Sequence, residues 1–335
     1  GWMPAGLAIV CLVTCALFTA FTGGSGVTII ALGALLMPAL KEAGYLDRFS
    51  LGMVTSAGSL GLLFAPSLPL ILYGVVSGEP IRDLFIAGII PGVLMITLLA
   101  GYSVWTCRGL KRPLVLFSRQ EALTSLRDAA WEIPLPLVVL GGIYSGFFAI
   151  SEAAAVMAVY VTVVEVFVLK EIPVSKLPGI MRESSVLIGA ILLILGLSLA
   201  STNFMIDAEI PQKLLALISQ WVSSEFTFLL LLLLFLLVLG AILDIFSSLV
   251  LIVPLVLPVA TEFGINPVHL GILFLAAMEL GYLTPPVGMN LFISSYRFDR
   301  PITAVYMSTI PFFLVMLVSV LMITFWPQLS LWLLA

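Results

Sequence analysis

Two short polar segments interrupt long apolar stretches of the chain, and their residue types could hold a cation. The first is Gly23-Gly24-Ser25, which offers backbone carbonyls and one hydroxyl. The second contains Asp244, Ser247 and Ser248. Hard cations such as sodium prefer oxygen ligands, and carbonyl groups supply them without a formal charge. We therefore predict a sodium site at each segment. The structural alternatives are a glycine-assisted turn at the first segment and a capping or loop acid at Asp244.

Two further interruptions are expected to complete these sites from the opposite side. The first segment would face the break that contains Gly58, Ser59 and Gly61. The second would face the break that contains Gly281, Thr284 and Pro285. Backbone that is freed from helical hydrogen bonding at such breaks is a source of carbonyl ligands for cations.

Polar side chains beside the breaks could bind the oxygens of a substrate. Ser67 and Asn290 come shortly after the two breaks, and together with Ser25 they form the predicted substrate set. Capping of the following half-helices is an equally good interpretation of Ser67 and Asn290. Glu279 directly precedes the second break and could line an ion path.

The elements that must position these residues are apolar. Of 335 residues, 61% are hydrophobic and 10% are charged, whereas a soluble domain has about 45–50% apolar and about 25% charged residues. The excess runs from end to end and predicts a polytopic membrane protein of helices. The net charge of −4, without a run of like charge, excludes nucleic acid as a partner.

A membrane-spanning helix needs about 20 apolar residues. Ordinary spans are predicted at Leu84–Thr106, Ile133–Ala149, Ala153–Leu169, Ser184–Phe204 and Ile302–Phe325. Interrupted apolar segments are predicted at Leu7–Leu40, Phe49–Val76, Phe226–Glu262 and Val268–Tyr296. Irregular backbone at membrane depth is tolerated where protein or a cavity satisfies its amides, so four interruptions favour a binding site.

The interrupted segments repeat. An offset of 220 residues pairs Gly61 with Gly281 and Pro66 with Pro286, and it aligns further Pro, Gly and Glu positions. We therefore predict an internal duplication. If Leu7–Leu40 and Phe226–Glu262 are re-entrant hairpins, most basic residues lie on the cytoplasmic side, as they do in most membrane proteins. The cytoplasmic set is Lys41, Arg48, Arg108, Lys111, Arg112, Arg119, Arg127, Lys170, Lys176, Arg182, Arg297 and Arg300, against Arg82 and Lys213 outside.

This topology opens the first hairpin to the cytoplasm and the second to the outside. The predicted fold is therefore an all-α polytopic membrane protein with inverted repeats, two re-entrant hairpins and two broken helices. Such an arrangement is typical of secondary transporters. The expected division is 1–78 and 226–297 as the two halves of a transport domain, 79–225 as scaffold and connecting helices, and 298–335 as a C-terminal scaffold helix.

The sequence argues against an enzyme. Gly23-Gly24-Ser25-Gly26 matches the GxSG pattern of intramembrane serine proteases, but that chemistry needs a histidine base close to the serine. The single histidine, His269, is expected at the membrane interface, away from the depth of Ser25. The chain has no HExxH, Walker A or CxxC motif. We expect no catalytic residue and no organic cofactor.

The interrupted segments resemble the large membrane subunit of TRAP transporters. The resemblance rests on GSLGLLFAPSLPLILYGVVSG (58–78), ISEAAAV (150–156), LDIFSSLVLIVPLVLPVATEFGINPVHLGI (243–272) and GYLTPPVGMNLF (281–292). It implies a sodium-driven importer of small organic anions, often C4-dicarboxylates or sialic acid, that works by an elevator mechanism in the bacterial inner membrane. It also implies two partners, a periplasmic binding protein and a small four-helix membrane subunit. Family members usually begin with further helices, so the chain is expected to be N-terminally truncated.

Two alternatives stay open. One is a proton- or cation-coupled carrier of the same broad architecture that acts without a binding protein; transport in vesicles without added periplasmic protein would identify it. The other is a non-transporting scaffold subunit, whose thermal stability would not respond to sodium.

Overall fold

The computed structural model describes residues 5–108, 118–218, 222 and 224–334. Its described residues form helices and no strands, and the chain divides into two compact units, 1–115 with 198–335, and 116–197. Lys111 and Arg112 of the predicted cytoplasmic set lie outside the described residues. The predicted division into transport and scaffold segments concerns movement and not compactness. The two compact units do not test it, and it stays a prediction.

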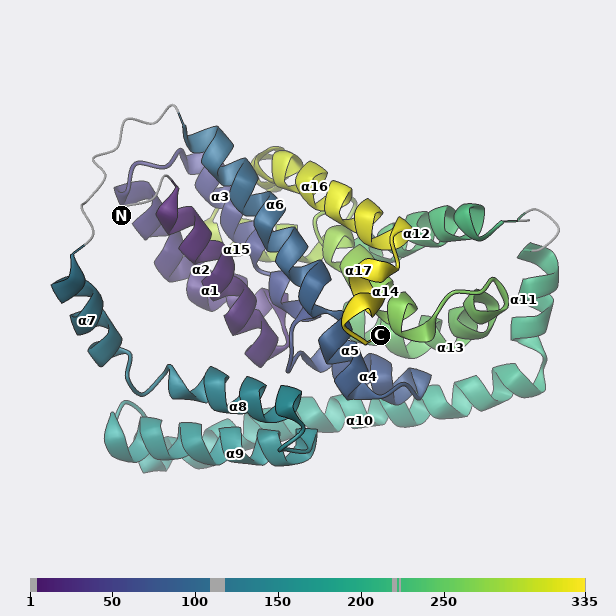
Figure 1. Ribbon diagram of the computed structural model, residues 1–335, viewed down its shortest axis with the longest axis horizontal. Helices are drawn as coiled ribbons and strands as arrows, with labels where there is room; N and C mark the ends of the chain where they lie inside the picture. The colour runs from purple at the N-terminus through teal and green to yellow at the C-terminus, as the bar shows by residue number, and fades with distance from the viewer. Residues whose placement is uncertain (1–4, 109–117, 219–221, 223, 335) are drawn as a thin grey trace. The chain divides into compact units, whose positions relative to one another are not determined.

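The first unit (Figure 1) contains the interrupted segments. Its helices are α1 (Gly6–Thr22), α2 (Ser25–Glu42), α3 (Asp47–Ala57), η1 (Leu60–Leu63), α4 (Leu68–Ser77), α5 (Ile81–Ala87), α6 (Ile89–Cys107), α11 (Ile210–Ile218), α12 (Glu225–Ile242), α13 (Ile245–Glu262), α14 (Pro267–Gly281), α15 (Met289–Phe298), α16 (Ile302–Phe325), α17 (Gln328–Leu331) and η4 (Trp332–Leu334).

The second unit contains connecting helices. They are α7 (Arg119–Asp128), α8 (Pro134–Ser145), α9 (Ile150–Val163), the π-helical η2 (Val164–Val168), η3 (Val174–Lys176) and the first part of α10 (Leu177–Asp207), which ends in the first unit. Within this unit the Tyr160 hydroxyl donates to the Trp131 carbonyl at 2.8 Å. The Glu152 carboxylate accepts from the Ala149 amide at 2.9 Å and caps α9, as expected of an acid at a helix N-terminus.

Seven helices of the described residues are long and apolar enough to cross a membrane, or up to eight if a bent pair counts as one span. This agrees with the predicted polytopic membrane protein. One predicted span, Ile133–Ala149, is shorter than expected, because α8 ends at Ser145. Gly146 takes a left-handed φ of 75°, which an L side chain rarely adopts, and the Phe148 amide turns back to the Gly142 carbonyl.

The two predicted hairpins are pairs of helices, and each pair is joined by two residues. Between α1 and α2, Gly23 has a φ of 70° and donates its amide to the Thr19 carbonyl, and the extended Gly24 precedes Ser25. Between α12 and α13, Leu243 and Asp244 are extended, and Asp244 is the N-cap of α13. Glycine permits the left-handed turn at the first tip, and a capping side chain starts the helix at the second.

The other two interrupted segments break as predicted. The first pair of helical stretches, 47–63 and 68–77, meets at an angle of 42°. The second break separates α14 from α15 over residues 282–288. The peptide bonds that precede Pro66 and Pro286 are both cis.

Helix boundaries in the two halves follow the offset of 220 residues. Added to the bounds of α2 (25 and 42), the offset gives 245 and 262, which are the bounds of α13. Added to 47, the start of α3, it gives 267, the start of α14. Gly44 and Gly264, which follow α2 and α13, have φ values of 79° and 83°. The inverted orientation of the halves stays a prediction.

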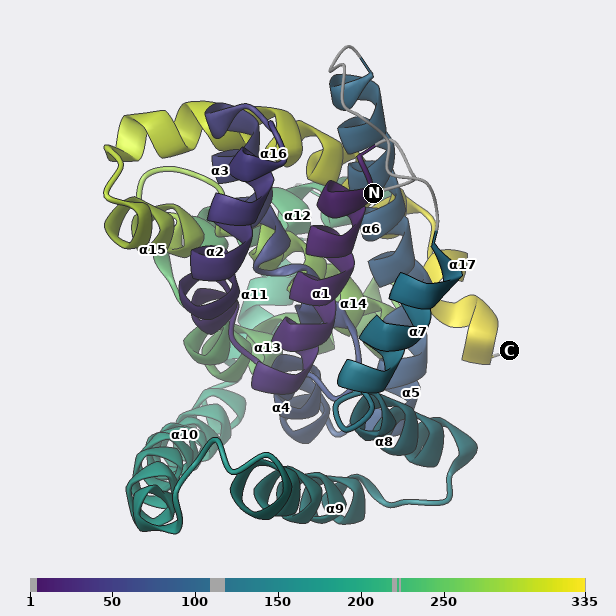
Figure 2. The same cartoon turned by 90° about the vertical axis from the view of Figure 1, so that its left-hand side faces the viewer.

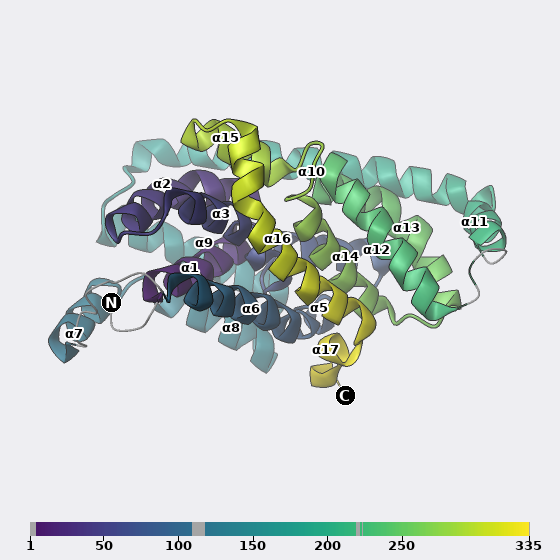
Figure 3. The same ribbon diagram turned by 90° about the horizontal axis from the view of Figure 1, so that it is seen from above.

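Both halves pack around α14 and α16. Figure 2 shows α3 beside α16, and Figure 3 shows α14 between α12 and α16. Every residue of α14 from Val268 to Gly281 is buried. Met37, Leu51, Leu291 and Val305 form a hydrophobic cluster that joins α2 and α3 to α15 and α16.

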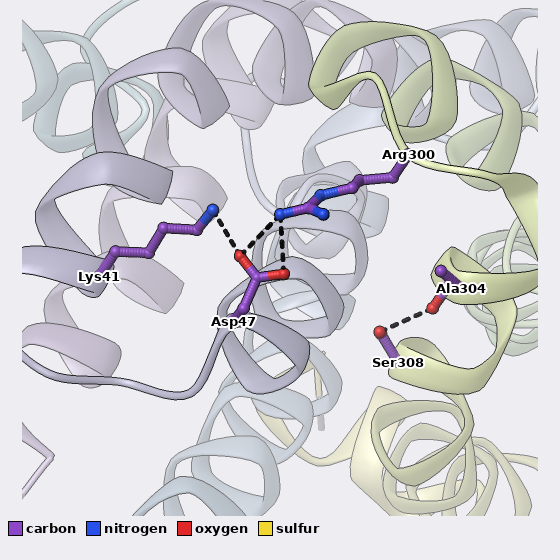
Figure 4. A network of polar contacts seen from close by, with 5 residues as sticks. All are labelled: Lys41, Asp47, Arg300, Ala304 and Ser308. Atoms are coloured by element: carbon purple, nitrogen blue, oxygen red, sulfur yellow. Dashed lines mark hydrogen bonds and ion pairs between the residues drawn. The ribbon is translucent and has the colours of Figure 1, made fainter.

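Charged side chains join the turn after α2 to the turn after α15 (Figure 4). Asp47 pairs with Lys41, and its carboxylate lies 3.0 Å from the guanidinium of Arg300. The three side chains are 40–47% exposed. This cluster links the two halves at one end of the unit.

Candidate ion and substrate sites

The first hairpin tip lies against the first break. A Cβ placed on Gly23 would come within 2.8 Å of the Leu68 Cβ, and one placed on Gly58 would come within 3.3 Å of the Ser25 carbonyl oxygen. The structure therefore brings together the residues predicted for the first sodium site. It also places the tip beside the start of α4, where Ser67 precedes the helix.

Glycine is required where α1 meets this break. A Cβ on Gly61 would lie 2.1 Å from the Ala16 carbonyl oxygen and 2.5 Å from the Ala20 nitrogen. Both are backbone atoms, which cannot move aside as a flexible side chain can. Gly61 thus allows η1 to approach α1, and the neighbouring Ser59 is fully buried, with its hydroxyl 3.4 Å from the Ser56 carbonyl.

The second hairpin tip lies against the second break. The Ile245 amide donates to the Tyr282 hydroxyl at 2.6 Å, and the Gly288 amide donates to the Ala241 carbonyl at 3.0 Å. Gly281 packs on Gly240 with no space for a side chain. The two segments predicted for the second site are adjacent, although Pro285 itself is exposed.

Asp244 has a structural function in addition to any ionic one. One carboxylate oxygen, Oδ2, accepts from the amides of Phe246 and Ser247 at 3.0 Å each. Asp244 therefore caps α13, the structural alternative named for it, and its negative charge also complements the positive end of the helix dipole. A carboxylate has about four acceptor positions, so capping leaves acceptor capacity on Asp244.

Buried polar atoms without hydrogen-bond partners among the described residues gather at both breaks. They include the hydroxyls of Ser67 and Ser248, the amide oxygen of Asn290 and both carboxyl oxygens of Glu279. All four residues are fully buried. Buried polar groups are normally paired, and an unpaired set inside a membrane protein is expected where an ion or substrate binds. Thr284, by contrast, donates to the Leu280 carbonyl of its own chain segment.

Three contacts at the breaks were not predicted from the sequence. The Thr19 hydroxyl donates to the Gly58 carbonyl at 2.8 Å. Thr55 and Ser294, 239 residues apart in sequence, join their hydroxyls at 2.9 Å. The Asn290 amide group lies 3.5 Å from the Thr55 carbonyl. A polar residue within a largely apolar helix was the signal that could have singled out Thr19. Thr55 and Ser294 stand in helices with other polar residues, so no such signal marks them.

His269 lies elsewhere and is buried by protein; its place at the membrane interface stays a prediction. It is 1% exposed, and its Nδ1 lies 3.2 Å from the Ser330 hydroxyl. The contact arises because α17 folds back onto the start of α14. His269 therefore packs against the C-terminal segment, and no contact joins it to Ser25 among the described residues.

Paired helices with facing breaks define a class of integral membrane transport proteins. In fold the chain is similar to the Alcanivorax borkumensis YdaH transporter, which matches with a TM-score of 0.56 over 98% of this chain and 86% of its own, at 16% identity. The family model for the tripartite ATP-independent periplasmic transporter, DctM component, matches residues 1–329. The chain belongs to this family, which is one of transporter permeases and not of enzymes.

Curated relatives agree with the family. The C4-dicarboxylate TRAP transporter large permease protein DctM of Pseudomonas aeruginosa is 34% identical over 99% of this chain and 78% of its own length. The ectoine/5-hydroxyectoine TRAP transporter large permease protein UehC of Ruegeria pomeroyi is 30% identical over the same shares. The isethionate TRAP transporter permease protein DctMQ of Oleidesulfovibrio alaskensis is 31% identical over 98% of this chain and 52% of its own. Together with the apolar spans, these relatives fit a place in the bacterial inner membrane.

Proposed function

We propose that the chain is the membrane permease of a sodium-coupled importer for a small organic acid. The observation that carries the proposal is the packing of each hairpin tip on a helix break, through Ser25 beside Gly58 and through Ile245 beside Tyr282. Each junction gathers carbonyls and hydroxyls, which are the ligands that sodium prefers. The proposed ligands are those predicted from the sequence, with Asp244 adding charge at the second site.

The proposed substrate site lies where half-helices begin. Ser67 precedes α4, and Asn290 lies in the first turn of α15. Helix N-termini carry partial positive charge that favours an anion, and Ser67 and Asn290 offer buried polar atoms without partners among the described residues. The names of relatives include C4-dicarboxylate, isethionate and ectoine transporters, and each of these substrates bears a carboxylate or sulfonate. We therefore propose a small carboxylate or sulfonate as substrate.

We also propose the two partners of the family. A periplasmic binding protein would deliver the substrate, and a small membrane subunit would complete the scaffold for an elevator movement. The isethionate relative is named DctMQ, and this chain covers only 52% of its length. Both facts are compatible with a small subunit that is fused in some members.

Sodium dependence is the direct test. The full-length chain, purified with its small subunit, is melted in sodium chloride or potassium chloride at equal ionic strength. A ligand bound only by the folded state stabilises it by about 2.7 kcal/mol at roughly 100 times its dissociation constant, so sodium should raise the melting temperature and potassium should not. An equal response to both salts contradicts the sodium sites.

Reconstitution separates the proposal from the alternative carrier. Proteoliposomes that contain the permease and its small subunit are given an inward sodium gradient, and uptake of succinate is measured first. The binding protein that is encoded beside the permease is added or omitted. Uptake should need both sodium and the binding protein. Uptake that a proton gradient drives without the binding protein would identify the alternative.

A further inference from the structure

Two threonines connect both arms of the first hairpin to the first break. Thr19 belongs to α1 and Thr28 to α2, and their hydroxyl oxygens lie 2.6 Å apart. The Thr19 hydroxyl also donates to the Gly58 carbonyl at 2.8 Å. The side chains are 0% and 1% exposed, so both hydroxyls are enclosed by protein.

The geometry determines the direction of the hydrogen bonds. A hydroxyl has a single proton, and Thr19 gives its proton to Gly58, so Thr28 must donate across the 2.6 Å contact. The Thr28 hydroxyl also lies 3.3 Å from the Gly24 carbonyl, which is a weaker alternative because it is longer. The result is a relay from Thr28 to Thr19 to the carbonyl oxygen of Gly58.

The Gly58 carbonyl is available to this relay because α3 ends there. The amide of Leu62, four residues on, would bond it in a continuous helix, but that amide donates to the Ser59 carbonyl instead. A carbonyl oxygen has two lone pairs. Thr19 occupies one of them, and the proposed sodium site would use the other.

The relay is not the usual arrangement of a helical threonine. Within helices, threonine hydroxyls generally bond a carbonyl one turn back, as Thr97 does with Val93 and Thr324 does with Val320. Thr19 reaches another element of the fold, 39 residues away in sequence. A purely packing residue would not need a hydroxyl at this position.

The second half of the chain has no counterpart of the relay. The offset of 220 residues places Leu239 at the position of Thr19 and Ser248 at the position of Thr28. Leucine cannot donate a hydrogen bond, and the Ser248 hydroxyl is buried without a partner among the described residues. The relay therefore distinguishes the first hairpin from the second.

We propose that Thr19 is a positioning residue that orients the Gly58 carbonyl for sodium, with Thr28 holding Thr19 in its donating geometry. The inference rests on the proposed sodium-coupled function. It adds a residue that contacts no ion itself and acts through the carbonyl. It also assigns the two halves different sensitivity to this pair of positions, since Leu239, at the position of Thr19 in the second half, has no hydroxyl.

Isosteric variants test the hydroxyl alone. Thr19→Val keeps the shape of the side chain and removes the donor, Thr19→Ser restores the donor, and Thr324→Val is the control, a buried threonine that bonds its own helix. The readout is the sodium concentration that gives half of the maximal thermal stabilisation, and half of the maximal uptake, with the full-length chain and its small subunit. Loss of one such hydrogen bond predicts a roughly tenfold increase for Thr19→Val, with Thr19→Ser and Thr324→Val near the wild type.

Thr28→Val provides a second variant, which leaves the Thr19 to Gly58 contact in place. We expect a smaller increase in the half-saturating sodium concentration, about threefold, because Thr19 keeps its bond to Gly58 and loses only the partner that orients it. If Thr19→Val does not fold, the half-saturating sodium concentration of Thr28→Val tests the inference in its place. A wild type that discriminates sodium from potassium, together with valine variants of unchanged half-saturation, overturns the inference alone. A wild type that responds equally to both salts overturns the proposed function and this inference with it.

Discussion

Gly281 lies directly against Gly240, so that a Cβ built on Gly281 would be 2.6 Å from the Gly240 Cα. The contact joins the end of α14 to the last turn of α12, just before the second hairpin tip. The atoms that this Cβ would meet, in Gly240 and Ala241, all belong to the backbone. Close packing of this kind requires the smallest side chain, as at small-residue interfaces between helices in membranes.

Gly281→Ala should therefore separate the second tip from its break. We expect a loss of about 2 kcal/mol or more in stability, the range of overpacked cores, measured as a lower melting temperature in detergent. Gly101→Ala, in α6, is the matched control because nothing lies within 4 Å of its Cβ position. That variant should be neutral or slightly stabilising, since alanine favours helix over glycine. Equal melting temperatures for the two variants would contradict the close contact.

The ion pair between Asp47 and Arg300 predicts a small effect. Both side chains are more than a third exposed, and exposed pairs contribute about 0.2–1 kcal/mol. A double-mutant cycle with Asp47→Asn and Arg300→Gln should give a coupling energy in that range, and it should shrink at high salt because exposed charges are screened. A coupling well above 1 kcal/mol that persists in high salt would show that the pair is effectively buried, for instance by lipid or a partner.

Glu279 offers a test of stability against function. Its carboxyl is fully buried, and neither oxygen has a partner among the described residues. Leaving a buried polar group unpaired costs about 1–3 kcal/mol, so Glu279→Met, which is apolar and of similar length, should raise the melting temperature in the absence of sodium. Residues retained at such a cost commonly serve function.

The same variant should impair uptake. Glu225→Met is the control, because Glu225 is an exposed acid in the first turn of α12, and it should leave both stability and transport nearly unchanged. If Glu279→Met transports at the wild-type rate, Glu279 has no part in the ion path.

The breaks were predictable because their signals are local. Gly23 permits a left-handed turn, and Asp244 is a capping residue, so each interruption could be placed from a few adjacent letters. The predicted length of the span at α8 was wrong, because Gly146 ends the helix through its backbone conformation. Composition does not reveal that conformation. The contact of His269 with Ser330 was not predictable, because it joins residues that are 61 apart in the sequence.

The tertiary contacts within the candidate site were less predictable. That each tip would meet a break followed from the repeat, but the hydroxyl of Thr19 on Gly58 did not. Thr19 stands in a helix where threonine commonly bonds its own backbone, and only the approach of η1 at Gly61 brings the other acceptor within reach. Contacts such as Thr55 with Ser294 depend on how two distant segments pack.

Asp244 carries both a cap and a charge, and substitution can separate them. Asparagine is as good an N-cap as aspartate, so Asp244→Asn should keep the bonds from Phe246 and Ser247, and with them expression and folding. It removes the charge that would strengthen cation binding, so sodium-driven uptake should be abolished or greatly weakened. Asp244→Ala removes both features and should in addition cost about 1 kcal/mol of stability. Glu225 is an exposed acid at the start of α12, and the control Glu225→Gln should leave sodium-driven uptake nearly unchanged. Normal transport by Asp244→Asn, with unchanged sodium dependence, would reduce Asp244 to a cap and leave the second site to carbonyls and hydroxyls.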